Sequence, residues 1–204
     1  MTDGRRFSPS AARNRDPIRA TFLSEMPNAG TILEIASGTG EHGIHITAAA
    51  PALIWHFSDP DPTARTSIAA WIRFAGRSRL VGPHDIRADA THWGEAIETL
   101  TFDGIVAINL LHISPFATTL GLFAGAARRL RSGGRLFLYG AFARDGRLAP
   151  SNAAFSQQLQ VQDPRWGVRD LEREIVPAAS REGLRLEGIV DMPANNLSVV
   201  FERS

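Results

Sequence analysis

Residues 31–43 (TILEIASGTGEHG) constrain the fold of this chain more than any other segment. An apolar run leads into a turn that contains Gly38 and Gly40, and a helical pattern follows the turn. Glycines let backbone N–H groups approach a ligand closely, and the start of a helix carries a partial positive charge. The segment therefore predicts a strand, a ligand-binding turn and a helix, an arrangement typical of nucleotide-binding α/β proteins.

Glu34 indicates which cofactor this turn binds. A carboxylate near the tip of a buried strand is costly unless it meets a positive or hydrogen-bonding partner, and S-adenosylmethionine (SAM) carries a positive charge. The spacing from Gly38 to Gly43 also fits the G-x-G-x-x-G pattern of NAD enzymes. A carboxylate just before such a turn would, however, repel a pyrophosphate. We therefore expect SAM before NAD; in the alternative, Glu34 pairs with an arginine and the glycines only form a turn.

The composition of the chain excludes several classes of function. All 22 basic residues are arginine and there is no cysteine, so Schiff-base lysines, thiolate nucleophiles and cysteine-bound zinc are ruled out, and we predict no metal site. The net charge of +1 gives no electrostatic case for binding nucleic acid or a membrane. No apolar stretch approaches the roughly 20 residues that span a bilayer. We expect a cytoplasmic protein that is a monomer or a homodimer.

Strand and helix patterns alternate along the chain. We predict strands at 31–36, 53–57, 80–83, 104–110, 135–140, 184–190 and 197–202. We predict helices at 16–26, 41–49, 62–76, 91–100, 153–161 and 170–180, and one between Pro115 and Ser132. The first helix is expected to begin at an N-cap, Asp16, followed by Pro17.

This alternation predicts one α/β domain over residues 1–204, with a Rossmann-like, doubly wound, mostly parallel seven-stranded sheet. The link between the last two strands is too short for a parallel crossover, so they should form a C-terminal antiparallel hairpin. Residues 1–28 are expected to form an N-terminal arm and helix, and residues 141–168 a lid-like insertion.

Polar residues beyond the carboxyl ends of the predicted strands are candidates for ligand binding, because ligands of such sheets bind there, where the strand order reverses. Asp59 lies 21 residues after Gly38, which predicts that it accepts both ribose hydroxyls of a nucleotide; an Asx turn before Pro60 would also explain it. His112 follows strand 104–110 and is a candidate general base, or a residue that caps or packs against the next helix. Where desolvation and in-line alignment suffice for methyl transfer, no essential base is needed.

The pattern around Glu34, an acid followed by three residues and then glycine, any residue and glycine, resembles motif I of class I SAM-dependent methyltransferases. More specifically, segments 33–42, 58–62, 109–115, 133–140, 166–170 and 191–196 together resemble the methyltransferase-like 26 family, over about residues 8–201. Glu41 departs from the glutamine expected there. The resemblance implies the class I methyltransferase fold, with SAM as cofactor and S-adenosylhomocysteine (SAH) as product, and it implies no secure substrate.

The residues expected to contact the cofactor are Glu34, Ala36, Gly38, Thr39, Gly40, His42, Asp59, Asp85, Ile86, Asn109 and Leu110. By resemblance, the Asp85 carboxylate and the Ile86 N–H would bind adenine, with Asp89 as the alternative acid. Asn109 and Leu110 would lie under the methionine part. The substrate candidates are Arg13, Asn14, Tyr139, Asn152, Trp166, Asn195 and Asn196. Trp166 could instead anchor the core, and the last two asparagines could simply form a turn.

The leading hypothesis is a SAM-dependent methyltransferase that acts on a small polar or planar molecule. The first alternative is a protein that binds SAM or SAH without turnover, since the case for a catalytic base is weak. The second is an NAD-dependent oxidoreductase, which the glycine spacing alone would favour.

Overall fold

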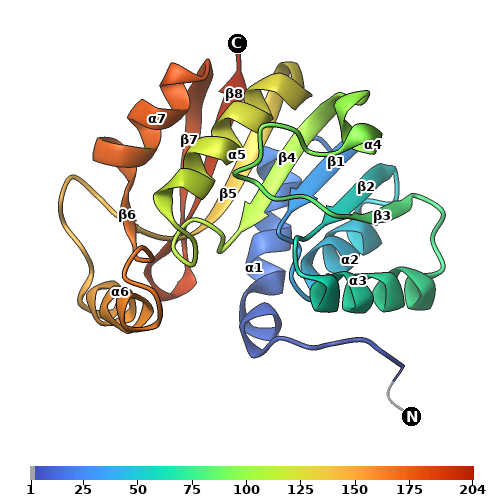
Figure 1. Ribbon diagram of the computed structural model, residues 1–204, viewed down its shortest axis with the longest axis horizontal. Coiled ribbons are helices and arrows are strands. Elements are labelled where there is room, and N and C mark those ends of the chain that lie inside the picture. The colour runs from blue at the N-terminus through green and yellow to red at the C-terminus, as the bar shows by residue number, and fades with distance from the viewer. Residues whose placement is uncertain (1–2) are drawn as a thin grey trace.

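A computed structural model describes residues 3–204 as an α/β domain with one sheet (Figure 1). The strands are β1 (Gly30–Ile35), β2 (Leu53–Ser58), β3 (Leu80–His84), β4 (Phe102–Ile108), β5 (Leu130–Ala143), β6 (Arg169–Asp170), β7 (Leu184–Met192) and β8 (Asn196–Arg203). The α-helices are α1 (Pro9–Glu25), α2 (Glu41–Ala49), α3 (Pro62–Ala75), α4 (Glu95–Glu98), α5 (Phe116–Arg129), α6 (Pro150–Gln162) and α7 (Val176–Arg181). A π-helical turn (Leu171–Ile175) precedes α7, and a 3-10 turn (Pro193–Asn195) joins β7 to β8.

The strand order is β3-β2-β1-β4-β5-β8-β7, with the two-residue β6 paired beside β5. Strands β1 to β5 run parallel, and β8 lies antiparallel between β5 and β7. The predicted doubly wound sheet and its C-terminal antiparallel hairpin are therefore confirmed. The chain order reverses between β1 and β4, which is the position where such sheets bind ligands.

Two apolar layers cover the sheet because its central strands are apolar on both faces. On β4, Ile105 and Ala107 belong to the cluster under α5 and α7, whereas Val106 and Ile108 belong to the cluster under α1, α2 and α3. Helix α6 lies apart from both layers, beyond the carboxyl edge of the sheet (Figure 1). No helix within residues 3–204 is long and apolar enough to cross a membrane.

The predicted start of the first helix is wrong. The helix begins at Pro9, capped by the Ser8 side chain, which accepts a hydrogen bond from the Ala11 N–H, and Pro17 lies inside it. The sequence contains the same cap-and-proline signal at Ser8-Pro9 and Asp16-Pro17, so local pattern does not choose between them. The earlier start matters because the added turns line the functional cavity.

Other boundaries also differ: the helix predicted at 91–100 is reduced to the four residues of α4, and the two-residue β6 is not among the seven predicted strands. Strand β5 is longer at both ends than the predicted 135–140. The predicted helix 170–180 does begin after Asp170, whose carboxylate caps it, but its first turn is π-helical. Pro177 supplies no N–H for a regular α-helical hydrogen bond in this segment, which is consistent with the irregular turn.

Candidate active site

A cavity of about 1020 Å³ lies at the carboxyl edge of the sheet, at the upper end of the range of about 300–1,000 Å³ that holds one drug-sized ligand. Its lining comes from α1, from the turn after β1, from the ends of β4 and β5, from α6 and from the turn between β7 and β8. The predicted site residues that line it are Glu34, Ala36, Gly38, Thr39, His42, Asn109, Arg13, Asn14, Tyr139, Asn152, Asn195 and Asn196. Residues from opposite ends of the chain therefore meet in one cavity.

We use two names for parts of this lining. The cofactor wall, named for the predicted contacts of its residues, consists of Glu34, residues 36–39, Ile108 and Asn109. The lid wall consists of Ser151, Asn152, Phe155, Leu159 and residues 193–196. Helix α1 and Tyr139 complete the cavity next to these two walls.

Two adjacent strands of the cofactor wall end in the same unusual conformation. Ala36 after β1 has a φ of 55°, and Asn109 after β4 has a φ of 60°. Non-glycine residues rarely adopt such angles, and strained residues of this kind cluster at ligand sites. The Asn109 N–H donates to the Tyr139 carbonyl at 2.7 Å, which helps hold the second of these turns. Both residues line the cavity at the point where the strand order reverses.

The glycine turn leaves room for a ligand at Gly38. A Cβ added to Gly38, at a φ of 57°, would have no atom within 4 Å, whereas one added to Gly40 would meet Ile68 at 3.2 Å. Gly38 therefore borders open space, and Gly40, which caps α2 and does not line the cavity, packs against α3. Contact between Gly40 and the cofactor stays a prediction.

Glu34 is buried in the cofactor wall with only 1% of its surface exposed. Its carboxylate accepts a hydrogen bond from the Trp55 indole N–H at 3.0 Å, and within residues 3–204 it forms no ion pair with an arginine. The alternative of a structural arginine pair is therefore wrong. Burial raises the pKa of Glu34 to about 7, because the charged form loses its hydration. The cavity thus contains a carboxyl group whose ionised form a cationic ligand would stabilise.

Asp59 braces the glycine turn from the end of β2. It is buried, and its two carboxylate oxygens accept hydrogen bonds from the Gly38 N–H and the Asp61 N–H, each at 2.9 Å. Burial raises the pKa of Asp59 despite these two bonds. Asp59 does not line the cavity, so its contact with a ribose stays a prediction.

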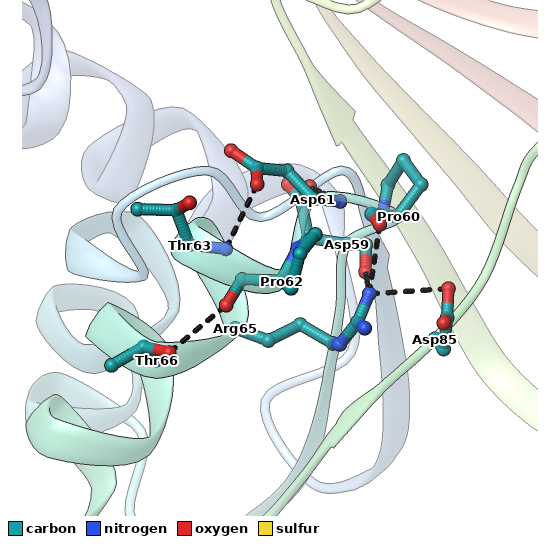
Figure 2. A network of polar contacts seen from close by, with 8 residues as sticks. All are labelled: Asp59, Pro60, Asp61, Pro62, Thr63, Arg65, Thr66 and Asp85. Carbon is teal, nitrogen blue, oxygen red and sulfur yellow. Dashed lines mark hydrogen bonds and ion pairs between the residues drawn. The ribbon is translucent and has the colours of Figure 1, made fainter.

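Arg65 connects the loops after β2 and β3 (Figure 2). Its guanidinium donates to the carbonyls of Asp59 and Pro60 at 2.9 and 2.8 Å and lies 3.2 Å from the Asp85 carboxylate. The Asp85 side chain is exposed and does not line the cavity, so an adenine contact there stays a prediction. Asp61 caps α3 by accepting from the Thr63 N–H, as its position before Pro62 predicts.

Two further residues of the predicted adenine and methionine contacts also lie outside the lining. Ile86 is buried in the core, and Leu110 is partly buried against the cluster under α5. The alternative acid, Asp89, forms an ion pair with Arg87. Contacts of these residues with a cofactor stay predictions.

Asn14 joins α1 to two other parts of the cavity. Its Oδ1 lies 2.9 Å from Nε2 of His42, at the start of α2, and its side chain lies beside that of Tyr139 in β5. Burial lowers the pKa of His42 to about 4, so its imidazole is neutral at pH 7 and Nε2–H donates to Asn14. Burial raises the pKa of Tyr139, so its phenol stays protonated.

His112 lies beside the cavity rather than in its lining. The His112 side chain is buried against Gly140. The ring of Phe155, which does line the cavity, packs edge-on against the imidazole, with 5.3 Å between the ring centroids. Burial lowers the pKa of His112 to about 4. The imidazole is therefore neutral, as a base must be, but catalysis needs a proton within hydrogen-bond reach, and a catalytic role stays a prediction.

The lid wall is held by asparagine side chains. The Asn152 amide donates to the Asn195 carbonyl at 2.8 Å, and the Asn195 amide donates to the Ser151 hydroxyl at 2.9 Å, so α6 docks on the turn between β7 and β8. The Asn196 amide donates to the Pro193 carbonyl at 3.0 Å. Trp166 is half-buried outside the cavity lining, so its substrate contact stays a prediction.

The sequence did not predict the hydrogen bonds of Glu41 that hold the start of α1 at the cavity. Glu41 is buried, and its carboxylate accepts hydrogen bonds from the Ser8 N–H at 2.7 Å and from the Thr39 hydroxyl at 2.8 Å. Glu41 thus joins the start of α1 to the glycine turn. Two sequence signals could have predicted this contact: an acid at position 41, where glutamine is expected, and the Ser8-Pro9 sequence, which can cap a helix. Phe155 was also missed, because an isolated aromatic residue in a polar helix has no distinctive pattern.

A family model described as "Protein of unknown function (DUF938)" matches residues 5–203, and the chain belongs to this family. Solved structures of similar fold include an O-methyltransferase family protein from Burkholderia thailandensis, which is 20% identical with a TM-score of 0.75; the match covers 96% of this chain and 57% of that one. An O-methyltransferase family 2 protein from Planctomyces limnophilus, in complex with apigenin, is 20% identical with a TM-score of 0.74 and coverages of 96% and 60%.

CalO1, a methyltransferase in calicheamicin biosynthesis solved in its SAH-bound form, is 20% identical with a TM-score of 0.70. The match covers 96% of this chain and 54% of CalO1. The chain thus spans little more than half the length of the solved proteins it matches. At these identities the likeness establishes the shared α/β fold.

Proposed function

We propose that the protein is a SAM-dependent methyltransferase that acts on a small-molecule acceptor. The observation that carries this proposal is the buried Glu34 carboxyl, without a cationic partner in residues 3–204, beside the open glycine turn. A sulfonium and an ammonium supply the missing positive charge, so the residues present fit SAM. The fold shared with several methyltransferases and the resemblance of segments such as 33–42 and 109–115 to the methyltransferase-like 26 family support the same proposal.

When bound, SAM supplies an electrophilic methyl group and leaves as SAH. The chain's own contribution is positioning. Glu34, residues 36–39 and Asn109 would hold the cofactor in the cofactor wall, while Tyr139 and the lid wall would orient the acceptor toward it. Apolar residues Phe155 and Leu159 of α6 would exclude water from the reacting groups. The volume of about 1020 Å³ leaves room for a second small ligand.

One observation favours binding without turnover as the second candidate. The imidazole of His42 lines the cavity but is hydrogen-bonded to Asn14. The candidate base His112 is buried behind Phe155, outside the lining. The NAD alternative has less support, because the buried carboxyl of Glu34 lines the region where a pyrophosphate would lie.

Calorimetric titration with SAM, SAH and NAD tests the proposal. We expect micromolar affinity for SAM and SAH and none for NAD. Binding of NAD alone, or of none of the three, would refute the cofactor assignment. Methyl transfer to any acceptor in the presence of SAM would then exclude the purely binding role.

A further inference from the structure

Arg13 is the one arginine that lines the cavity within the described residues. The carboxyl group of the lining, Glu34, lies in the cofactor wall, and the imidazole, His42, is neutral and hydrogen-bonded to Asn14. No acidic side chain from α1, from α6 or from the turn between β7 and β8 lines the cavity. The side of the cavity next to α1 therefore carries a positive charge that its own lining does not neutralise.

Most N–H donors of the Arg13 guanidinium have no hydrogen-bond partner within residues 3–204. Within residues 3–204 its side chain makes one hydrogen bond, to the Ser10 hydroxyl at 3.3 Å, and no ion pair. Arg65 is a useful contrast, because two carbonyls and the Asp85 carboxylate already occupy its guanidinium (Figure 2). Arg13 is exposed at the cavity and is not needed to hold the fold together.

A second donor, the Tyr139 hydroxyl, lines the same cavity. The residue after Arg13, Asn14, accepts a hydrogen bond from His42 and lies beside Tyr139, the only tyrosine in the chain. The phenol remains protonated at neutral pH, so it can donate its proton to a ligand. A guanidinium from α1 and a phenol from β5 that line the same cavity offer donors for the two oxygens of a carboxylate.

We propose that Arg13 and Tyr139 form a carboxylate-binding subsite at the α1 side of the cavity. This inference rests on the proposed function and deepens it. The carboxylate belongs either to the methionine part of the cofactor or to the acceptor, and the chemistry that recognises it is the same in both cases. Arg13 would form the charged hydrogen bonds, and Tyr139 would add a neutral donor.

The first arm of the test compares SAH with 5′-methylthioadenosine, which has the same nucleoside and sulfur but lacks the amino-acid carboxylate. Affinities are measured by calorimetry for the wild type, Arg13→Gln and a control, Arg15→Gln, an exposed residue of the same helix that does not line the cavity. If the subsite binds the cofactor, Arg13→Gln weakens SAH about tenfold or more and leaves methylthioadenosine unchanged.

The second arm uses protein saturated with SAH and matched pairs of probes, benzoate with benzamide and 4-hydroxybenzoate with 4-hydroxybenzamide. If the subsite binds the acceptor, the wild type prefers an acid over its amide by about tenfold, and Arg13→Gln loses that preference. Tyr139→Phe should lose part of the affinity in whichever arm responds. Arg15→Gln should match the wild type in both arms.

The two ideas fail in distinguishable ways. If SAH binds and Arg13→Gln behaves like Arg15→Gln in both arms, the carboxylate subsite is overturned while the proposed function survives. If the wild type binds neither SAH nor methylthioadenosine, the proposed function fails and the subsite fails with it.

Discussion

The cofactor wall and the lid wall face the same cavity but differ in how far they depend on backbone bonds. In the cofactor wall, backbone bonds accompany the side-chain bond from the Gly38 N–H to Asp59: the Ser37 N–H donates to the Ser58 carbonyl, and the Asn109 N–H donates to the Tyr139 carbonyl, each at 2.7 Å. In the lid wall, the side chains of Asn152 and Asn195 make the connections. Backbone bonds depend on conformation, whereas side-chain bonds depend on residue identity. The lid wall can therefore change with few substitutions while the fold and the cofactor wall persist.

The largest effect is expected from filling the space at Gly38. Gly38→Arg should weaken SAM binding more than about 100-fold, because a long side chain would occupy the space in front of the glycine turn. Calorimetry with SAM measures the loss. Gly76→Arg is the matched control, since Gly76 also has a positive φ of 61° with no atom within 4 Å of an added Cβ, but lies at the end of α3 away from the cavity. Equal SAM affinities of Gly38→Arg and Gly76→Arg would show that the glycine turn is not part of the SAM site.

A smaller effect is expected on the unfolding free energy when the pH is lowered, through the buried imidazole of His112. The pKa of His112 is lowered from 6.5 to about 4 in the folded protein, so the unfolded chain binds more protons between these values. The stability from the neutral imidazole is present above pH 6.5 and is lost as the pH falls toward 4, up to about 2 kcal/mol at pH 5. Urea unfolding at pH 7.5 and pH 5 measures it.

His112→Asn should lose less stability than the wild type over this pH interval, because the titrating group is absent. His92→Asn, at an exposed position, should behave like the wild type. If His112→Asn and the wild type show the same pH dependence, the imidazole is not held neutral by burial.

The lid wall can be loosened without touching the cofactor wall. Asn152→Ala removes the amide that donates to the Asn195 carbonyl and should lower the unfolding free energy by about 1–2 kcal/mol. SAH affinity should stay within about twofold, because Asn152 belongs to the lid wall and its side-chain amide bonds within that wall. Asn28→Ala, which removes an exposed amide that donates to the Leu23 carbonyl, serves as the control and should cost less. A large loss of SAH affinity in Asn152→Ala would show that the two walls act as one unit.

The smallest effect concerns the proton on Glu34. Its pKa of about 7 leaves a large share of the molecules protonated at pH 6.5, and a bound cation would favour the ionised form. SAM binding should therefore release up to about 0.8 proton per molecule at that pH. Calorimetry in two buffers with different ionisation enthalpies measures the release. Glu34→Gln should release no proton from this position, and a release equal to that of the wild type would place its source elsewhere.

The sequence was most informative where local pattern decides structure. The strand, glycine turn and helix from β1 to α2 lie within about one residue of their predicted bounds, because apolar runs and glycine positions specify them locally. The lid wall was harder to predict. Asn152 and Asn195 are far apart in the chain, and only the docking of α6 shows that one bonds the other. The start of α1 was not predicted because two similar cap signals, Ser8-Pro9 and Asp16-Pro17, compete. The bond between Glu41 and the Ser8 N–H favours the first, but it joins residues far apart in the chain.

Pro17 divides α1 into two segments with different support. It has no N–H, so the Arg13 carbonyl loses its helical partner, and the cooperative hydrogen-bond ladder is interrupted beside the cavity. The second segment is anchored in the core by Ile18 and Phe22, whereas the first depends largely on the Glu41 and His42 contacts. Amide hydrogens of the first segment can therefore exchange by local opening while those of the second remain protected, and their exchange rate reports directly on whether the cavity is occupied.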